Sequence, residues 1–360
     1  MNKSRETTVV MDARKDDSGY ETAVKLLQAG EVVAFPTETV YGLGADATND
    51  EAVRKIFEAK GRPADNPLIV HIADFQQLDA IVSEIPDVAR ICMEKFWPGP
   101  LTLILPKGPT LSKYVTANLP SVGIRMPNHP VAMRLIRQTG LPIAAPSANR
   151  SGRPSPTCAQ HVWEDLKDRI PLILDGGETA VGLESTVLDC TVSPPIILRP
   201  GEITQEMLQQ VIGDVSMDAG LLEEHHAPKS PGMKYTHYAP QGDMTVLEGD
   251  PKRIRTSIRE LCQQMLLEQP NQRVGVLLTT NQTGDEAFCE QLDQMGVEWI
   301  IRPQGNADIQ ETGQHLYQWL REFDEKNVAK ILAEGVPVQG FGAAVMNRMR
   351  KAAGHSIIRV

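Results

Sequence analysis

The chain has 360 residues, of which 41% are hydrophobic and 23% are charged, and its formal net charge is -10. This length exceeds what one hydrophobic core usually serves, so we expect two domains, the larger of which can bury a sizeable cleft. No apolar run is long enough to span a bilayer, and the N-terminal segment lacks the apolar core of a secretory signal, which predicts a cytoplasmic protein without a membrane partner. The acidic balance argues against broad attraction to nucleic acid, so an anionic ligand would need a local cluster of cations.

The cysteines and the missing motifs argue against several kinds of site. The five cysteines are widely spread and include no CxxC pair, which favours buried free thiols over zinc or redox chemistry. The chain has no Walker A sequence, no GxGxxG after a strand and no GxSxG nucleophile elbow. If ATP binds here, it therefore binds at a site built without a Walker A or GxGxxG loop. The cysteines are Cys92, Cys158, Cys190, Cys262 and Cys289.

The first part of the chain alternates helical and extended patterns. Apolar residues at helical spacing predict a helix over 18–30, with Ser18 as its N-cap and Gly30 as its stop, followed by a buried strand within 31–38. The alternation continues and predicts an α/β sheet domain. Further strands are expected at 67–72, 101–105, 121–126, 141–145, 171–174, 185–189 and 195–199, and helices near 50–59, 75–95, 129–139 and 157–168.

The periodicity lapses between residues 213 and 243, where Pro, Gly, His and Tyr mix without a helix or strand pattern, so we expect a linker. Beyond the linker, strands and helices alternate again, which predicts a small parallel, doubly wound sheet of Rossmann type. The predicted domains are 15–212 and 244–360. The strands of the second domain are expected within 244–250, 273–280, 297–303 and 329–337, and its helices at 251–268, 284–295 and 306–324.

Polar residues follow the first buried strand in the segment PTETVYGLGAD. Thr37, Glu38 and Thr39 come directly after the strand, at the kind of strand end where open α/β sheets place ligands. Gly42 and Gly44 are expected to allow tight backbone turns and close approach to a ligand. A glycine loop capped by threonines explains the segment about equally well.

The segment KGRPADNPLIVH is more specific, because it holds two cations and an amide. Lys60 supplies a mobile point charge and Arg62 a planar fork, which together with Asn66 suit a polyphosphate. The alternative is a solvated basic loop. His71 lies in the following strand and, taken alone, is better explained as a hydrogen-bonded core histidine.

An arginine lies on an otherwise apolar strand in SVGIRMP. Strand alternation predicts that Val122 and Ile124 face one side while Gly123 and Arg125 face the other. A buried arginine needs an anionic partner, which is either a protein carboxylate or a ligand carboxylate. From this segment alone, the internal salt bridge is the commoner outcome.

Small hydroxyl groups are concentrated in IAAPSANRSGRPSPT, a loop with little helix tendency. Ser147, Asn149, Ser151 and Ser155 would fit ribose or phosphate oxygens, and a merely polar loop is the alternative.

Two later segments complete the polar set. GLESTVLD places Ser185 and Thr186 at the start of a strand, and IILRPGEIT places Arg199 at the end of one. Arg199 would add a further cation to the cleft.

The ordered series PTETVYGLG, KGRPADNPLIVH, FWPGPLTLIL, SVGIRMP, APSANRSG, GLESTVLD and LRPGE closely resembles the YrdC-like family of threonylcarbamoyl-AMP synthases. The match spans roughly residues 15–210, and SPGMKYTHYAP with the smaller domain resembles the family's longer, two-domain form. The resemblance implies a twisted, mixed-sheet YrdC-like domain, a linker over 213–243 and a small Rossmann-like C-terminal domain.

The resemblance also implies roles for residues at the matching positions. Lys60 and Arg62 would be catalytic, Lys60 lying near bicarbonate and the phosphates, and Arg125 would meet the carboxylate of L-threonine. The remaining implied contacts fall into two sets. Those to L-threonine are Thr37, His71, Arg125, Ala145 and Ser185. Those to ATP are Arg62, Asn66, Ser121, Ser147, Ser155, Arg199 and Tyr238. Mg2+ would be held by the phosphates, with no metal ligand from the protein.

The activity that the resemblance implies is that of a nucleotidyltransferase. It would condense L-threonine, bicarbonate and ATP into threonylcarbamoyl-AMP and pyrophosphate, and pass the product to the machinery that modifies tRNA next to the anticodon. Contact with RNA is a further expectation. The main alternative is a double-stranded RNA-binding module without catalysis. A carbamoyltransferase of hydrogenase maturation would need cysteine-rich zinc segments, which five scattered cysteines cannot supply.

The linker leads to a second hypothesis. Tyr235, His237 and Tyr238 lie in a segment flanked by Pro and Gly, which would close over the nucleotide and exclude water from a labile acyl-adenylate. An ordinary tether is the alternative.

Overall fold

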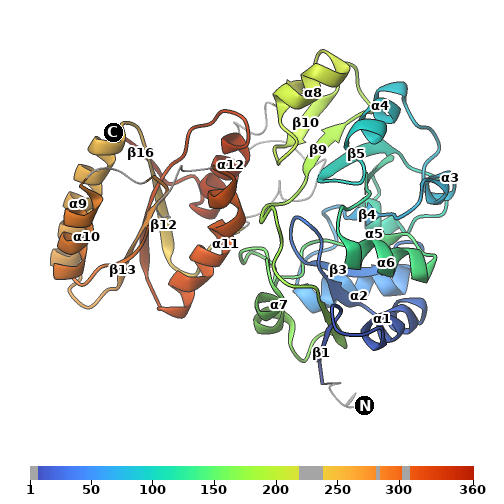
Figure 1. The fold of residues 1–360 in the computed structure, drawn as a ribbon, viewed down its shortest axis with the longest axis horizontal. Coiled ribbons are helices and arrows are strands. Elements are labelled where there is room, and N and C mark those ends of the chain that lie inside the picture. The colour runs from blue at the N-terminus through green and yellow to red at the C-terminus, as the bar shows by residue number, and fades with distance from the viewer. Residues whose placement is uncertain (1–6, 219–237, 281–283, 302–308) are drawn as a thin grey trace. The chain divides into compact units, whose positions relative to one another are not determined.

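A computed structural model describes residues 7–218, 238–280, 284–301 and 309–360 of the chain (Figure 1). The chain divides into two compact units. One comprises Met1–Ser151 and Ser155–Tyr235, and the other comprises Gly152–Pro154 and Thr236–Val360. The limits of the predicted domains stay a prediction. His225, His226, Tyr235 and His237 lie outside the described residues.

The first unit is built on a mixed sheet, which confirms the predicted fold class. Its described strands lie in the order β1-β8-β2-β3-β7-β4-β6-β5-β9-β10-β11. Some neighbours pair in parallel, such as β4 with β6, and others pair antiparallel, such as β5 with β6. The strands are β1 (Val9–Asp12), β2 (Val33–Phe35), β3 (Gly42–Asp46), β4 (Ile69–His71), β5 (Leu101–Pro106), β6 (Ser121–Arg125), β7 (Ile143–Ala144), β8 (Leu172–Asp175), β9 (Thr186–Asp189), β10 (Ile196–Arg199) and β11 (Ser216–Met217).

Helices surround this sheet. β2 and β4 are buried at every position, as expected for strands that are covered on both faces. The helical segments are α1 (Ser18–Gln28), α2 (Asp50–Lys60), the 3-10 helix η1 (Phe75–Gln77), α3 (Leu78–Ile81), α4 (Asp87–Phe96), α5 (Lys113–Thr116), α6 (Pro130–Thr139), α7 (Ala159–Leu166) and α8 (Gln205–Ile212).

Helix α2 shows how local sequence places one functional side chain. The side chain of Asn49 accepts hydrogen bonds from the backbone N–H groups of Glu51 and Ala52, which satisfies free donors at the N-terminus. Gly61 adopts a left-handed conformation with φ of 63° and ends the helix. Lys60 is therefore fixed as the last residue of α2.

Three details of the predicted first domain were wrong. Gly42 and Gly44 do not form turns, because both lie within β3. At Gly44 the reason is space, since a Cβ atom would lie 2.6 Å from the ring of Phe35. The predicted helix over 75–95 is broken between Ile81 and Asp87, because Pro86 disfavours helical backbone at the residue before it. Ser18 is the first residue of α1 rather than its N-cap.

The second unit holds a five-stranded sheet in the order β14-β13-β15-β12-β16, in which every pairing is parallel. Figure 1 shows α9 and α10 on one face of this sheet and α11 and α12 on the other, so the predicted doubly wound arrangement is confirmed. The strands are β12 (Asp243–Glu248), β13 (Val274–Leu278), β14 (Glu298–Ile301), β15 (Lys330–Glu334) and β16 (Ile357–Arg359). The helices are α9 (Pro251–Glu268), α10 (Asp285–Gln294), α11 (Ile309–Glu325) and α12 (Gly342–Ala352).

A carboxylate fills the crevice at the ends of β13 and β15. The chain leaves these adjacent strands toward opposite faces, which is the arrangement where doubly wound sheets bind ligands. Glu334 is 1% exposed, and its Oε2 accepts the backbone N–H groups of Thr279 and Thr280, each at 2.8 Å. Its Oε1 lies 2.9 Å from Nη1 of Arg255, which also pairs with Asp285. The carboxylate of Glu334 thus lies where other doubly wound sheets bind an anionic ligand.

None of the helices within the described ranges is both long enough and apolar enough to cross a membrane.

We predict that Glu334→Ala destabilises the protein by about 3–5 kcal/mol, because it removes one of the two carboxylates that pair with the buried Arg255 and leaves two buried N–H groups without an acceptor. The measurement is urea-induced unfolding followed by circular dichroism, with the exposed Glu268→Ala as control. Equal stability of the two variants would contradict this account of the crevice.

Candidate active site

Lys60 is held in the interior by uncharged oxygens. Its ammonium donates to the carbonyl oxygens of Ser147 at 2.5 Å and Asn149 at 2.6 Å, and to Oδ1 of Asn149 at 3.3 Å. Burial lowers the pKa of Lys60 well below its usual range, and Arg62 lowers it further, whereas the carboxylates of Asp165 and Glu184 oppose this. A buried cation held in this way is ready to attract an anionic ligand.

The loop after α2 brings Arg62 and Asn66 together. Nη2 of Arg62 donates to the carbonyl oxygen of Asn66 at 3.2 Å, and the guanidinium lies 5.9 Å from the ring centre of Phe57. The side-chain amide of Asn66 is fully buried, yet neither its nitrogen nor its oxygen has a hydrogen-bond partner among the described residues. Buried amides are normally satisfied, so this one is a candidate for contact with a ligand.

Arg125 forms an ion pair with an internal carboxylate, one of the two partners left open by the sequence. Its Nη2 lies 2.6 Å from Oε2 of Glu38, although the angles are not those of a hydrogen bond. Nη1 donates to Oγ1 of Thr39 at 2.8 Å, and Nε donates to the carbonyl oxygen of Gly99 at 3.4 Å. Thr39 in turn contacts Thr37, whose hydroxyl also donates to the carbonyl oxygen of Val40. Glu38 and Thr39 of the PTET segment therefore contact the guanidinium, and Thr37 contacts Thr39.

His71 lies beside Arg125, because the two are register partners in the parallel pair β4 and β6. Burial and the neighbouring guanidinium lower the pKa of His71 to about 3, so the ring is neutral at physiological pH. The ring packs edge-on against Phe35, and Nδ1 has no hydrogen-bond partner among the described residues.

Arg199 and Ser185 form a second cluster. Nε of Arg199 donates to the carbonyl oxygen of Ser185 at 3.0 Å, and Nη2 donates to its hydroxyl oxygen at 3.2 Å. That hydroxyl also lies 2.8 Å from Oγ1 of Thr102 in β5. Arg199 is 4% exposed and ends β10, so the cation lies in the interior beside the start of β9.

The loop that carries Ser147, Asn149, Ser151 and Ser155, called the serine loop below, lies against β3 and Lys60. Ser147 forms a bridge with Gly42 and its hydroxyl donates to Asn149, the same residue that holds Lys60. Ser155 is fully buried, and its hydroxyl donates to Glu184 at 2.5 Å.

Ala145 lies directly after β7. Its backbone N–H donates to the carbonyl oxygen of Ile69 at 2.9 Å, which holds it against β4. A Cβ atom on Gly42 would lie 3.2 Å from the methyl group of Ala145, so the glycine permits this close packing.

Hydrogen bonds to two consecutive carbonyl groups, those of Gly99 and Pro100, join the two arginine clusters. Arg125 donates to the carbonyl of Gly99, and the N–H of Thr186 donates to the next carbonyl, that of Pro100, at 3.0 Å. Glu202, close after Arg199, is half-buried, and burial raises its pKa, as does the charge of Glu38. The structure therefore brings most of the predicted residues into one connected region of the first unit.

The two remaining predicted residues are Ser121 and Tyr238. Ser121 begins β6, at the opposite end of that strand from Arg125, and the parallel register of β4 and β6 sets it level with the residue that follows Asn66. Tyr238 belongs to the second unit, where it is 5% exposed and its ring stacks on Tyr317 at 5.4 Å. Arg348 lies over the same tyrosine ring at 5.7 Å.

Three side chains in contact with the predicted residues, Glu38, Thr102 and Glu184, have no assigned role in the sequence analysis. Neither does Glu202, which lies within electrostatic reach of Arg125. Glu38 and Glu184 each stand beside a predicted residue within a motif, Thr37 and Ser185 respectively, and this adjacency is the signal that points to them. Nothing in the local sequence singles out Thr102, which lies within an apolar strand.

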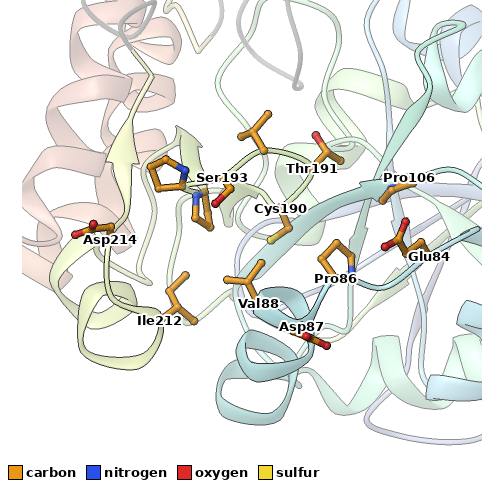
Figure 2. Close-up of a pocket in the computed structure, with 13 residues that line it drawn as sticks. Glu84, Pro86, Asp87, Val88, Pro106, Cys190, Thr191, Ser193, Ile212 and Asp214 are labelled. Atoms are coloured by element: carbon orange, nitrogen blue, oxygen red, sulfur yellow. The ribbon is translucent and has the colours of Figure 1, made fainter.

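A hollow of about 690 Å3 lies at the other end of β9 (Figure 2). Cys190 and Thr191 line it directly after that strand, together with Pro106 from the end of β5 and Val88 from α4. None of the predicted site residues lines this hollow, so it is separate from the region described above.

Comparisons with known proteins agree over both units. Residues 25–201 match a family model described as telomere recombination, and residues 203–354 match one described as threonylcarbamoyl-AMP synthase, C-terminal domain. The chain is similar to the threonylcarbamoyl-AMP synthase of Bacillus subtilis, with 51% identity over 96% of this chain and 95% of that protein. It is 44% identical to the synthase of Pyrococcus abyssi, over 98% of this chain and 100% of that protein.

A solved structure supports the same relationship. The crystal structure of P. abyssi Sua5 complexed with L-threonine matches with a TM-score of 0.88 and 44% identity, over 98% of this chain and 99% of that chain.

Burial of His71 predicts a specific pH dependence of folding. Its folded pKa of about 3 lies below the unfolded value near 6.5, so the unfolded state binds more protons between these values and stability falls as the pH falls. We expect His71 to reduce the free energy of unfolding by roughly 2 kcal/mol between pH 7 and pH 5. His71→Leu should lack this part of the slope in urea titrations at both pH values. An identical slope in the variant would contradict the neutral, buried ring.

Proposed function

The chain belongs to the threonylcarbamoyl-AMP synthase family, and from this membership and the site we infer that it condenses L-threonine, bicarbonate and ATP into threonylcarbamoyl-AMP and pyrophosphate. The observation that supports this most directly is the burial of three cations in one region of an acidic chain. Lys60, Arg125 and Arg199 are each less than 5% exposed. Buried cations require anions, and these substrates supply a triphosphate, a carboxylate and bicarbonate.

We assign L-threonine to the cluster around Arg125. Its carboxylate would pair with the guanidinium, whose planar fork suits a carboxylate. The neutral ring of His71 and the hydroxyl groups of Thr37 and Ser185 offer polar contacts, and the methyl group of Ala145 offers an apolar one. Their burial supports this assignment, because a closed pocket strengthens each of these interactions.

We assign ATP to the region of Lys60 and the serine loop. The unsatisfied amide of Asn66 and the adjacent Arg62 support this assignment, since a phosphate or ribose would satisfy the buried amide. Ser147, Ser155 and Arg199 would make further contacts. Ser121 and Tyr238 remain predicted contacts to ATP.

The chemistry then needs little from a protein nucleophile. The amine of threonine attacks bicarbonate, or carbon dioxide formed from it, and water is lost as a carbamate forms. A carbamate oxygen attacks the α-phosphorus of ATP, and the bond to the leaving pyrophosphate breaks. Lys60 and Arg62 would neutralise the charge that develops at the α-phosphorus, so positioning and electrostatic stabilisation supply most of the acceleration.

Mg2+ would enter with ATP, since divalent magnesium binds phosphate oxygens and neutralises part of their charge. The carboxylates near the site agree with binding of the metal by the phosphates. Glu38 and Glu184, two acidic side chains beside the predicted residues, already contact Arg125 and Ser155. The protein residues would therefore hold the nucleotide and leave the metal to the phosphates.

The product would pass to the machinery that attaches threonylcarbamoyl groups to tRNA next to the anticodon. Such an acyl-adenylate reacts readily with water, so a segment that covers the site would prolong its lifetime. The linker remains our candidate for this cover, and direct contact with RNA remains a separate proposal.

The deciding experiment measures pyrophosphate release by the full chain with ATP, Mg2+ and bicarbonate, with and without L-threonine. We expect release only when threonine and bicarbonate are both present, together with a nucleotide product of the mass of threonylcarbamoyl-AMP. Folded protein that releases no pyrophosphate, yet retains double-stranded RNA in a salt-dependent way, would favour the RNA-binding alternative.

A further inference from the structure

Glu38 is a buried carboxylate with unused hydrogen-bonding capacity. It is 7% exposed, and its charge is balanced by Arg125 at 2.6 Å. Neither of its carboxylate oxygens accepts a hydrogen bond from any described residue. Because an ionised carboxylate can accept several hydrogen bonds, a buried one that accepts none is poorly satisfied by the protein alone. A ligand that donates hydrogen bonds would correct this.

The charges around Glu38 point to a cationic donor. Glu202 also lies within its electrostatic reach, and the presence of Glu38 raises the pKa of that second carboxyl group. Burial lowers the pKa of His129, the N-cap of α6, and the charge of Glu38 opposes this by raising it. Arg125 is thus the strong cation that faces Glu38, and it is shared with Thr39 and Gly99.

The chemistry of the proposed substrate matches this arrangement. An α-amino acid carries a carboxylate and an ammonium on neighbouring atoms, so its complement is a cation and an anion side by side. Arg125 and Glu38 form such a pair in the interior. A pocket with Arg125 alone would bury the ammonium without a partner, which is strongly unfavourable.

We propose that Glu38 is a substrate-binding residue that receives the ammonium group of L-threonine while Arg125 receives the carboxylate. The inference rests on the proposed function and extends it, since Glu38 would be the group that selects amino acids over hydroxy acids. On binding, the substrate replaces one ion pair by two, and the ammonium satisfies oxygens that the protein leaves without hydrogen bonds. Once the amine loses its proton, it lies beside the site of carbamate formation.

The test is a four-way binding comparison that separates the ammonium from the carboxylate. L-threonine and its amine-free analogue, in which a hydroxyl group replaces the α-amino group, are titrated calorimetrically into the wild-type full chain and into Glu38→Gln. We expect Glu38→Gln to weaken L-threonine by roughly 10- to 100-fold, the range for a lost charged hydrogen bond, and to leave the affinity for the analogue unchanged within about 2-fold. Glu178→Gln, an exposed carboxyl group, serves as the matched control.

Each other outcome overturns the proposal in a recognisable way. Equal weakening of both ligands would mean that Glu38 acts only through the orientation of Arg125. No weakening of either would remove Glu38 from the pocket. If Glu38→Gln does not fold, Glu38→Asp replaces it, and this variant should lose threonine affinity more than analogue affinity. A wild-type chain that binds no L-threonine and makes no product fails the proposed function itself, whereas normal product formation without selective weakening fails this inference alone.

Discussion

The ammonium of Lys60 is buried against oxygens that carry no formal charge, and much of the site is arranged around this one constraint. Two carbonyl groups of the serine loop must face the end of α2 to hold the ammonium, and the N–H of Ser151 returns a bond to the carbonyl oxygen of Lys60. These bonds place Ser147 and Asn149 at the C-terminal end of α2. The cation is stabilised enough to remain inside, but its charge is not cancelled, so a phosphate gains the full attraction on binding.

The two units treat buried charge in opposite ways. In the second unit, Arg255 meets two carboxylates, and Glu334 also accepts the N–H groups at the end of β13 and the hydroxyl of Thr280, so both carboxylate oxygens of Glu334 have hydrogen-bond partners. In the first unit, Asn66 and Glu38 keep unsatisfied polar atoms. Because buried polar groups are normally paired, the first unit carries the signature of a ligand site and the crevice of the second carries that of a structural element.

Local patterns in the sequence predicted most elements, and long-range packing decided the rest. Helix α9 and the strands that contain His71 and Arg125 follow directly from apolar periodicity. The glycines of β3 were misread because their role depends on Phe35, which lies opposite only after folding. The motifs supplied the residue types of the site, but the pairing of Arg125 with Glu38 depends on strand order, which no short window of sequence contains.

The most direct test of the central claim is the proton balance of ATP binding, measured calorimetrically in buffers of different ionisation enthalpy. If phosphate binds beside the buried ammonium, it raises the lowered pKa of Lys60, so ATP binding should take up protons at pH values between the pKa of Lys60 in the free protein and its pKa in the complex. Lys60→Met should abolish this uptake, and Lys55→Met, which removes a partly exposed lysine, should retain it. Equal proton uptake by the wild type and Lys60→Met would contradict a phosphate site at Lys60.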